Sequence, residues 1–203
     1  MGEFGTAVIL AGGRSSRMRF DKQLLYKGEQ SLIKRICSSL RARFDDIVIV
    51  SNTPGLYAAE GVRVVSDLFP GLGPLAGIHA GLTHAESQWV FVTACDMPFV
   101  DLPYIDYMMS RIKGTEYEAC VTDYYSDKSA RYQAFHAFYS LKSLPVMEGD
   151  LEAQKASIAY FLRKIDTLVI PPDLARRYIT VSNPFLNLNT RSDYERFLFG
   201  EEG

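Results

Sequence analysis

Residues 7–25 read AVILAGGRSSRMRFDKQLL and join an apolar run to a glycine pair and a cluster of cations. The continuous apolar run at 7–10 is typical of a buried strand in a parallel sheet covered on both faces. Gly12 and Gly13 follow that strand directly. Because ligands of open α/β sheets bind beyond the carboxyl ends of the strands, this turn lies where an anion would bind. The cations after it are Arg14, Arg17, Arg19 and Lys22.

The glycine pair favours phosphate binding for a steric reason. Without Cβ atoms, successive backbone N–H groups can turn toward an anion, and the cations that follow supply charge for phosphate oxygens. The alternative interpretation is a tight turn with a solvated basic face. Two known phosphate motifs do not fit, because GxxxxGK[ST] is absent and Gly12-Gly13-Arg14 lacks the spacing of a dinucleotide fingerprint.

Apolar runs alternate with helix-length segments along the chain, which predicts an α/β fold with a mostly parallel central sheet and helices on both faces. The predicted strands are 6–10, 46–51, 63–66, 89–94, 119–122, 134–139 and 167–170. The predicted helices are 31–44, 74–85, 102–113, 151–163 and 191–199. Ser31 can cap the first helix, Pro74 suits a first helical turn, and Asp193 favours a helix start. The segment 113–131 is expected to be irregular.

Composition limits the classes of function. The 203 residues, which we expect to form one domain (1–203), are 47% hydrophobic and 23% charged with a formal net charge of −2. With so small a net charge, the protein has no overall electrostatic field that would attract nucleic acid or anionic lipid, so we expect neither as a partner. No apolar run approaches the roughly 20 residues that span a bilayer, and the three cysteines lack a paired or metal-like spacing. These features predict a cytoplasmic protein.

A second candidate site follows another apolar strand. Residues 90–100 read VFVTACDMPFV, so Asp96 ends up at the same sheet edge as the glycine pair. A carboxylate there is a natural ligand for Mg²⁺, which takes one or two carboxylates together with substrate phosphates. The alternative is an aspartate that caps the following turn.

Other patterns favour ordinary structural roles. Residues 71–76, GLGPLA, match G-x-G-x-x-A, but residues 67–70 separate them from the preceding strand, whereas a nicotinamide or flavin fingerprint needs a tight strand-to-helix turn. A helix that begins at Pro74 could instead lay its N-terminus against a base or ribose. His79 and His84 are five residues apart, which is the wrong spacing for metal ligands on one helical face. The residues expected to pack the core are Trp89 and an aromatic cluster of Tyr104, Tyr107, Tyr160 and Phe161.

Together these stretches resemble the molybdenum cofactor guanylyltransferases, which have a nucleotide-diphosphate-sugar transferase-like fold. The motifs occur in the family's order from residue 7 to about 197, and they are LAGGRSSRM at 10–18, DK at 21–22, GPLAG at 73–77, ACDMP at 94–98 and NLNT at 187–190. The resemblance implies a three-layer Rossmann-like fold. It also implies transfer of GMP from GTP to the terminal phosphate of molybdopterin, with release of pyrophosphate and with Mg²⁺ as the cofactor.

The resemblance also assigns roles to individual residues. Lys22, Arg17 and Asp96 would be the catalytic residues, and Asp96 would hold Mg²⁺. Asn52 and Asp67, which follow the second and third strands, would contact the base or ribose, and Asn187 and Asn189 would lie toward the pterin. The remaining nucleotide-binding residues would be Leu10, Ala11, Gly12, Gly13, Arg14 and Gly77.

Departures from the family pattern leave alternatives open. Arg19-Phe20 stands where the family usually has a glycine, and the segment 117–140, which would recognise the pterin, matches loosely. The alternatives are a cytidylyltransferase, a sugar-phosphate nucleotidyltransferase and a GTP-binding regulatory protein without turnover. Gly12-Gly13 and Asp21-Lys22 favour guanine over cytosine, since the cytidylyl family tends to have Ala-Gly and Pro-Lys there. Transient contact with proteins of molybdenum cofactor biosynthesis, or with proteins that accept the cofactor, is a further expectation.

Overall fold

The computed structural model describes residues 2–12, 26–27, 30–53, 55, 57, 62–123 and 132–199. Within these residues a seven-stranded sheet has the order β5-β4-β1-β6-β8-β7-β9. The strands are β1 (Gly2–Leu10), β4 (Asp46–Val50), β5 (Arg63–Val65), β6 (Ser87–Ala94), β7 (Ala119–Asp123), β8 (Tyr132–Ser140) and β9 (Thr167–Ile170). A separate short hairpin joins β2 (Tyr26–Lys27) to β3 (Gln30–Ser31).

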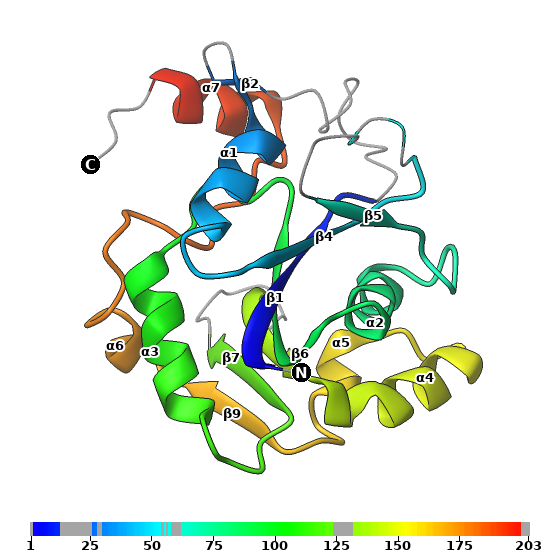
Figure 1. Ribbon diagram of the computed structural model, residues 1–203. Coiled ribbons are helices and arrows are strands. Elements are labelled where there is room, and N and C mark those ends of the chain that lie inside the picture. The colour runs from blue at the N-terminus through cyan, green and yellow to red at the C-terminus, as the bar shows by residue number, and fades with distance from the viewer. Residues whose placement is uncertain are drawn as a thin grey trace.

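Helices cover both faces of the sheet (Figure 1). α1 (Leu32–Leu40), α3 (Leu102–Ile112), α6 (Pro172–Ala175) and α7 (Arg191–Phe199) contribute to the core on one face. α2 (Pro74–Thr83), α4 (Leu144–Glu152) and α5 (Ile158–Phe161) contribute to the core on the other face, and a short 3₁₀ helix (Leu141–Ser143) precedes α4. The predicted three-layer α/β architecture is therefore confirmed.

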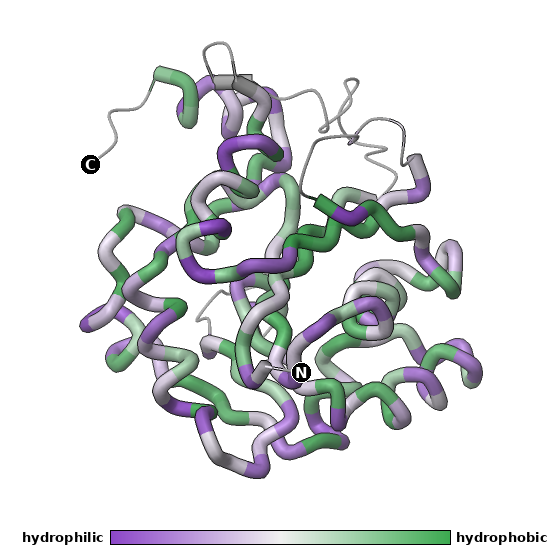
Figure 2. Tube along the Cα trace, viewed as in Figure 1, coloured by the Kyte–Doolittle hydropathy of each residue, from purple (hydrophilic) through white to green (hydrophobic). Residues whose placement is uncertain are grey.

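β1 shows why its sequence is apolar at successive positions. Ala7 and Ile9 pack into the core beneath α1 and α3, whereas Val8 and Leu10 pack into the core beneath α2. Side chains alternate between the two faces of a strand, so a strand covered on both faces needs apolar residues throughout. Figure 2 shows the same continuous hydrophobic character along β4, next to β1 in the sheet.

Most of the sheet is parallel. β1 pairs in parallel with β4 and β6, and the pairs β4–β5 and β7–β9 are also parallel. β8 is the exception, because it runs antiparallel to both β6 and β7. Since β8 lies between them, β7 points in the same direction as β6, and the carboxyl ends of β1, β4, β6 and β7 meet at one edge.

A large irregularity interrupts the pairing of β7 with β8 and forms a bulge in β8. Cys120 pairs with Phe138 and Thr122 pairs with Gln133, so residues 134–137 lie opposite the single residue Val121. His136 within the bulge has φ of 57°, a left-handed conformation that non-glycine residues seldom adopt. The bulge re-aims side chains at the edge of the sheet where the candidate site lies.

The seven predicted strands are all confirmed, with shifts only at their ends. The helix expected at 151–163 is wrong, because α4 ends at Glu152 and α5 begins at Ile158. Gln154 adopts a left-handed φ of 60° and breaks the helix, and the Ser157 hydroxyl then accepts the Tyr160 N–H as a new cap. Ser31 precedes α1 but makes no side-chain capping bond, and α1 ends at Leu40 rather than at 44. Residues 113–131, expected to be irregular, contain the regular strand β7.

The aromatic cluster expected in the core is also corrected. Tyr104 and Phe161 are fully buried, but they lie in the cores on opposite faces of the sheet. Tyr160 is 42% exposed. The reason is that α3 and α5 cover different faces, so residues with helical spacing on each of them never meet. Trp89 is buried as predicted, His79 is also buried, and Pro74 does occupy the first turn of α2.

Candidate active site at the carboxyl edge of the sheet

The turn after β1 is held between the ends of two neighbouring strands. The Ala11 N–H donates to the Val50 carbonyl at 2.9 Å, and the Cys95 N–H donates to the Leu10 carbonyl at 3.0 Å. Ala11 is buried, whereas Gly12 is exposed, with no described atom within 4 Å of the position that a Cβ would occupy. The end of β1 therefore delivers an open backbone segment to the sheet edge.

Asp96 lies just beyond the end of the adjacent strand, β6. Leu10 is paired with Ala94 in the register of β1 and β6, so Gly12 and Asp96 each stand two residues beyond a paired position. Asp96 is partly exposed. Its backbone carbonyl accepts the Leu188 N–H at 2.9 Å, which brings residues 187–189 to the end of β6. The structure thus assembles three of the predicted motifs at one place.

Asn187 and Asn189 are positioned by the start of α7. The Asn187 side-chain amide donates to the Phe185 carbonyl at 3.0 Å, and the Asn189 N–H donates to the Asp193 carboxylate at 3.2 Å. Asp193 also accepts the Thr190 N–H, while the Thr190 hydroxyl accepts the Asp193 N–H, which is a reciprocal cap. Burial acts to raise the pKa of Asp193, but hydrogen bonds from Thr190, Arg196 and Asn189 outweigh it and lower the pKa.

Asn52 and Asp67 meet beyond the ends of β4 and β5. The Asn52 side-chain oxygen accepts the Asp67 N–H at 3.3 Å, and the Asp67 carboxylate accepts the Phe69 N–H at 2.9 Å. Asn52 is exposed and Asp67 is partly exposed. Both therefore line the same edge as Gly12, one and two strands away from β1.

The start of α2 has a glycine-dependent turn, and Gly77 in the first half of α2 lies against β1. Gly71 and Gly73 have φ of 89° and 77°, where a side chain would be strained, and Gly73 precedes the first residue of α2. Gly77 is buried, and a Cβ there would lie 3.3 Å from a Leu10 methyl group. Gly77 therefore packs α2 against β1, and its expected contact with the nucleotide stays a prediction.

Two buried polar residues form a hub that the sequence reasoning missed. The fully buried Asp101 carboxylate accepts the Tyr104 N–H, the N–H groups of Thr180 and Val181, and the Thr180 hydroxyl at 2.6–3.2 Å. The Asp101 N–H donates to Nε2 of His136 at 3.3 Å. Burial lowers the pKa of His136 to about 4, so its ring is neutral. No local pattern could reveal this hub, because Thr180 is 79 residues from Asp101.

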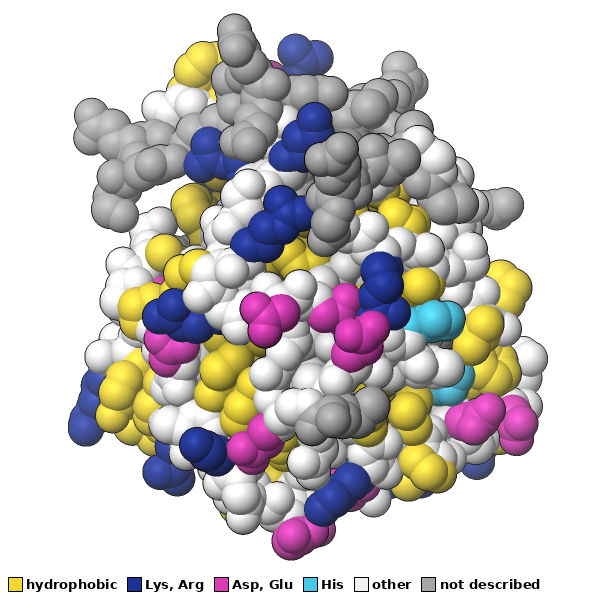
Figure 3. Space-filling model, in the orientation of Figure 1, with side chains coloured by type: hydrophobic (Ala, Val, Ile, Leu, Met, Phe, Trp, Pro, Cys, Tyr) yellow, Lys and Arg dark blue, Asp and Glu magenta, His cyan; other side chains and the backbone are white. Residues whose placement is uncertain are grey.

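The predicted residues Gly13, Arg14, Arg17 and Lys22 lie outside the described residues, and their roles stay predictions. In the described part, Lys and Arg side chains gather over α1 on the face that Figure 3 shows. No group of three or more His, Cys, Asp or Glu side chains that could hold a metal ion occurs in the described ranges. Nor does any helix there have the length and apolar character needed to cross a membrane.

An open α/β sheet with a glycine turn and a carboxylate on neighbouring strand ends defines a nucleotide-binding protein of the Rossmann-like class. Residues 7–180 match the MobA-like NTP transferase domain. A molybdenum cofactor guanylyltransferase from Syntrophotalea carbinolica is 42% identical over 195 residues, which are 96% of this chain and 91% of that protein. A relative from Peptoclostridium acidaminophilum, named "Probable molybdenum cofactor guanylyltransferase", is 40% identical over 96% of this chain and 88% of its own length.

Solved structures share the fold. The molybdopterin-guanine dinucleotide biosynthesis protein A from Archaeoglobus fulgidus has a TM-score of 0.78 at 22% identity, covering 94% of this chain and 95% of that one. The 2-C-methyl-D-erythritol 4-phosphate cytidylyltransferase from Thermus thermophilus has a TM-score of 0.68 at 13% identity, covering 97% of each. The protein belongs to the MobA-like NTP transferase family and is a nucleotidyltransferase.

Proposed function

We propose that the protein transfers GMP from GTP to the terminal phosphate of molybdopterin. The observation that carries this proposal is that Gly12 and Asp96 each lie two residues beyond the paired residues Leu10 and Ala94 of neighbouring strands. The chain that places them there is 42% identical to a molybdenum cofactor guanylyltransferase. The sheet edge between them offers an open backbone segment for phosphates and a carboxylate beside it. A cytidylyltransferase is less well supported, because the cytidylyltransferase from Thermus thermophilus shares the fold at only 13% identity.

The proposed reaction needs no covalent intermediate on the protein. An oxygen of the acceptor phosphate forms a bond to the α-phosphorus of GTP, while the bond from that phosphorus to the oxygen bridging to the β-phosphorus breaks. Pyrophosphate carries away the electron pair of the broken bond. The protein contributes positioning and charge neutralisation, for which we propose the backbone at Gly12 and Gly13 together with Lys22 and either Arg14 or Arg17.

Asp96 fits a magnesium ion that arrives with the nucleotide. Mg²⁺ needs one or two carboxylates when substrate phosphates complete its coordination, and a single partly exposed carboxylate at the phosphate edge meets that need. A bound Mg²⁺ would neutralise charge on the phosphates during transfer. We propose Asp96 as its protein ligand. The protein's own part is to hold that carboxylate near the phosphates, which the Leu188–Asp96 backbone bond helps to do.

The remaining assignments belong to the same proposal. Asn52 and Asp67 would contact the base or ribose, since they extend the edge on the β4 side of β1. Asn187 and Asn189 would face the acceptor, because the Leu188 N–H ties their segment to the end of β6. We also propose that the protein acts in the cytoplasm and meets other proteins of molybdenum cofactor biosynthesis transiently. The three cysteines form no disulfide, which agrees with a reducing compartment.

Calorimetric titration with GTP, CTP and ATP, each with and without Mg²⁺, tests the nucleotide part. We expect Mg²⁺-dependent binding of GTP that is lost in Lys22→Ala. In a transfer assay with molybdopterin, Asp96→Asn should lower turnover by at least about a hundredfold, because the phosphate charge is no longer neutralised. Its thermal midpoint should stay close to wild type, since Asp96 is partly exposed.

Asp45→Asn is the matched control for Asp96→Asn. Asp45 is exposed and lies just before β4, at the opposite edge of the sheet, so its loss should change neither binding nor turnover. Preferred binding of CTP would move the protein to the cytidylyltransferases. GTP binding without transfer would indicate the regulatory alternative, and near-normal turnover of Asp96→Asn at saturating Mg²⁺ would remove Asp96 from the mechanism.

A further inference from the structure

A contact between two rings ties the loop that joins β5 to α2 (Figure 1) to the buried part of α2. In this loop, residues 66–73, the Phe69 ring packs edge-to-face against the His79 ring. The ring centroids are 5.2 Å apart and the planes meet at 78°. His79 lies in the second turn of α2 and is only 4% exposed, whereas Phe69 is partly buried. The loop is therefore anchored to a helix that packs on the sheet.

Hydrogen bonds extend this anchoring to two residues of the candidate site. The Phe69 N–H donates to the Asp67 carboxylate oxygen Oδ1 at 2.9 Å, and the Asp67 N–H donates to the Asn52 side-chain oxygen at 3.3 Å. The Leu72 N–H donates to the Phe69 carbonyl at 3.2 Å, which closes the turn ahead of α2. Because Phe69 is joined to Asp67 by this bond and by only one intervening residue, the position of its ring helps to fix the position of the Asp67 carboxylate.

Asp67 and Asn52 keep polar groups for a ligand after these bonds are made. Among the described residues, the second carboxylate oxygen of Asp67 accepts no hydrogen bond and the amide N–H groups of Asn52 donate none. Asn52 is exposed and Asp67 is partly exposed, so both groups can be reached from outside. A carboxylate oxygen accepts from hydroxyl or N–H groups and a side-chain amide donates to carbonyl or ring-nitrogen atoms. This pair suits a nucleoside, which carries both kinds of group.

The His79 ring takes part in this contact as an aromatic surface rather than as a charge. Burial lowers the pKa of His79, although the nearby carboxylates of Glu148 and Asp67 act to raise it, so the ring is neutral at pH 7. Its Nδ1 atom is buried and has no hydrogen-bond partner among the residues that the structure describes. The ring therefore holds Phe69 by its edge-to-face packing, which stabilises aromatic pairs beyond the area they bury.

We propose that His79 is a positioning residue for the nucleoside part of the nucleotide, an inference that rests on the proposed guanylyl transfer. Through the Phe69 ring His79 holds Asp67, and through Asp67 it also holds Asn52, where the base or ribose of GTP binds. His79 acts from the core and does not touch the nucleotide, because its side chain is buried. The phosphates and the acceptor bind elsewhere along the sheet edge and do not depend on this contact.

Calorimetric titration with GTP and Mg²⁺ tests the ring contact in single variants and in their combination. His79→Leu keeps an apolar side chain but removes the ring, so it should weaken GTP binding by about three- to tenfold. Phe69→Leu should weaken it by a similar factor. The double variant should bind no more weakly than either single variant, because both substitutions remove the same contact. His79→Phe restores an aromatic ring and should bind GTP as tightly as the wild type.

Steady-state transfer kinetics separate positioning from a general loss of stability. His79→Leu should raise KM for GTP by the same factor and leave kcat and KM for molybdopterin unchanged, because only binding of the nucleoside is weakened. Leu151→Val is the control for lost stability, since Leu151 is fully buried in α4 within the same core layer as α2. It should lower the thermal midpoint without changing either KM.

Wild-type GTP affinity in His79→Leu, additive losses in the double variant, or equal rises in the two KM values would overturn the positioning role. The double variant decides even if His79→Phe does not fold. If the wild type transfers GMP while His79→Leu keeps its GTP affinity, the positioning role is wrong and the function stands. If the wild type binds CTP instead, and His79→Leu weakens that binding, guanylyl transfer is wrong and the positioning role stands. No binding of any nucleotide would overturn both.

Discussion

Asp101 and His136 show how single buried polar residues fix the loop at 180–181 against the start of α3. A carboxylate removed from water is costly unless donors replace the lost solvent. Asp101 receives four hydrogen bonds, three of them from residues 180 and 181, so the loop at 180–181 is tied to the start of α3. His136 completes the hub as a neutral ring that accepts the Asp101 N–H.

The neutral state of His136 predicts a specific pH dependence of stability. Burial lowers its pKa from 6.5 to about 4, so between those values the unfolded chain takes up a proton that the folded chain refuses. Stability should therefore be unaffected above about pH 7 and fall by up to about 3 kcal/mol as the pH drops to 4. Urea unfolding of wild type and His136→Asn across pH 4–8 measures this loss.

Asparagine is chosen because it tolerates positive φ and its side-chain oxygen can accept the Asp101 N–H. The variant will be less stable at every pH, but its free energy of unfolding should fall less steeply between pH 6.5 and 4. Parallel curves for the two proteins over that range would mean that His136 does not titrate between the folded and unfolded states.

At the scale of elements, the contact of α2 with β1 helps to set the position of the turn at Gly12, which follows β1. α2 is apolar on nearly all sides and buried between the sheet and α4. Its glycines let the helix approach closely, since a Cβ at Gly81 would lie 2.5 Å from Val8 Cγ1. Gly77 allows the same approach to Leu10, which immediately precedes the turn. The packing of α2 therefore bears on the same strand that carries the turn at Gly12.

Gly81→Ala should destabilise the protein by about 1–3 kcal/mol, because the added methyl overpacks the helix–strand contact. Gly149→Ala in α4 is the matched control, since nothing lies within 4 Å of its Cβ position and alanine favours helix by up to about 1 kcal/mol. Val8→Ala should restore part of the loss in the Gly81→Ala background. Urea midpoints measure all three, and equal effects of the two glycine substitutions would contradict the packing argument.

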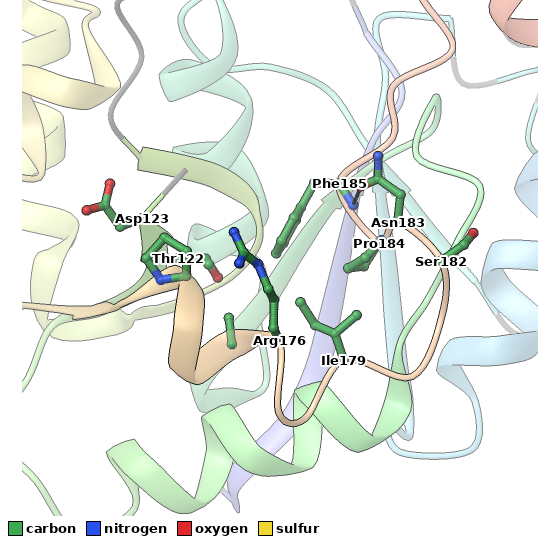
Figure 4. Close-up of a pocket in the computed structure, with 10 residues that line it drawn as sticks. Thr122, Asp123, Arg176, Ile179, Ser182, Asn183, Pro184 and Phe185 are labelled. Atoms are coloured by element: carbon green, nitrogen blue, oxygen red, sulfur yellow. Dashed lines mark hydrogen bonds between the residues drawn. The ribbon is translucent and has the colours of Figure 1, made fainter. Parts of the chain in front are cut away.

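At the scale of the molecule, the sheet has two halves that meet between β6 and β8. The half formed by β5, β4, β1 and β6 is wholly parallel, and it carries Gly12, Asn52, Asp67 and Asp96 at its carboxyl edge. The other half includes the antiparallel β8 and carries a pocket lined by Thr122, Asp123 and Phe185, among others (Figure 4). The segment at 187–189 crosses from one half to the other through its bond to Asp96.

Hydrogen exchange should show that GTP and molybdopterin protect different backbone segments. With Mg²⁺ and GTP, we expect slower exchange at 10–12, 51–53 and 94–97 and little change at 187–189. Molybdopterin should protect 187–189, because binding removes backbone from solvent only where the ligand lies. Mass spectrometry of peptic peptides provides the measurement. Protection of 187–189 by GTP alone would place the nucleotide against the segment proposed for the acceptor.

Local signals determined most of what the sequence could reveal. Apolar runs marked all seven strands, and Asp193 marked the start of α7, because those patterns reflect the burial and hydrogen bonding of neighbouring residues. The edge rule for parallel sheets then placed Gly12 and Asp96 together, as the register confirms. The roles of Arg14, Arg17 and Lys22 rest on sequence alone.

Only the tertiary structure decided the rest. The break between α4 and α5 coincides with Gln154, whose left-handed conformation no helical periodicity signals, and the ion pair of Asp150 with Lys164 bridges the break. Asp101 bonds to His136 and Thr180, which are 35 and 79 positions away in the sequence. The pocket lined by Thr122 and Phe185 likewise combines β7 with a loop some 60 residues later. Such contacts depend on how strands and crossovers close on one another in space, so they leave no mark on any short stretch of the chain.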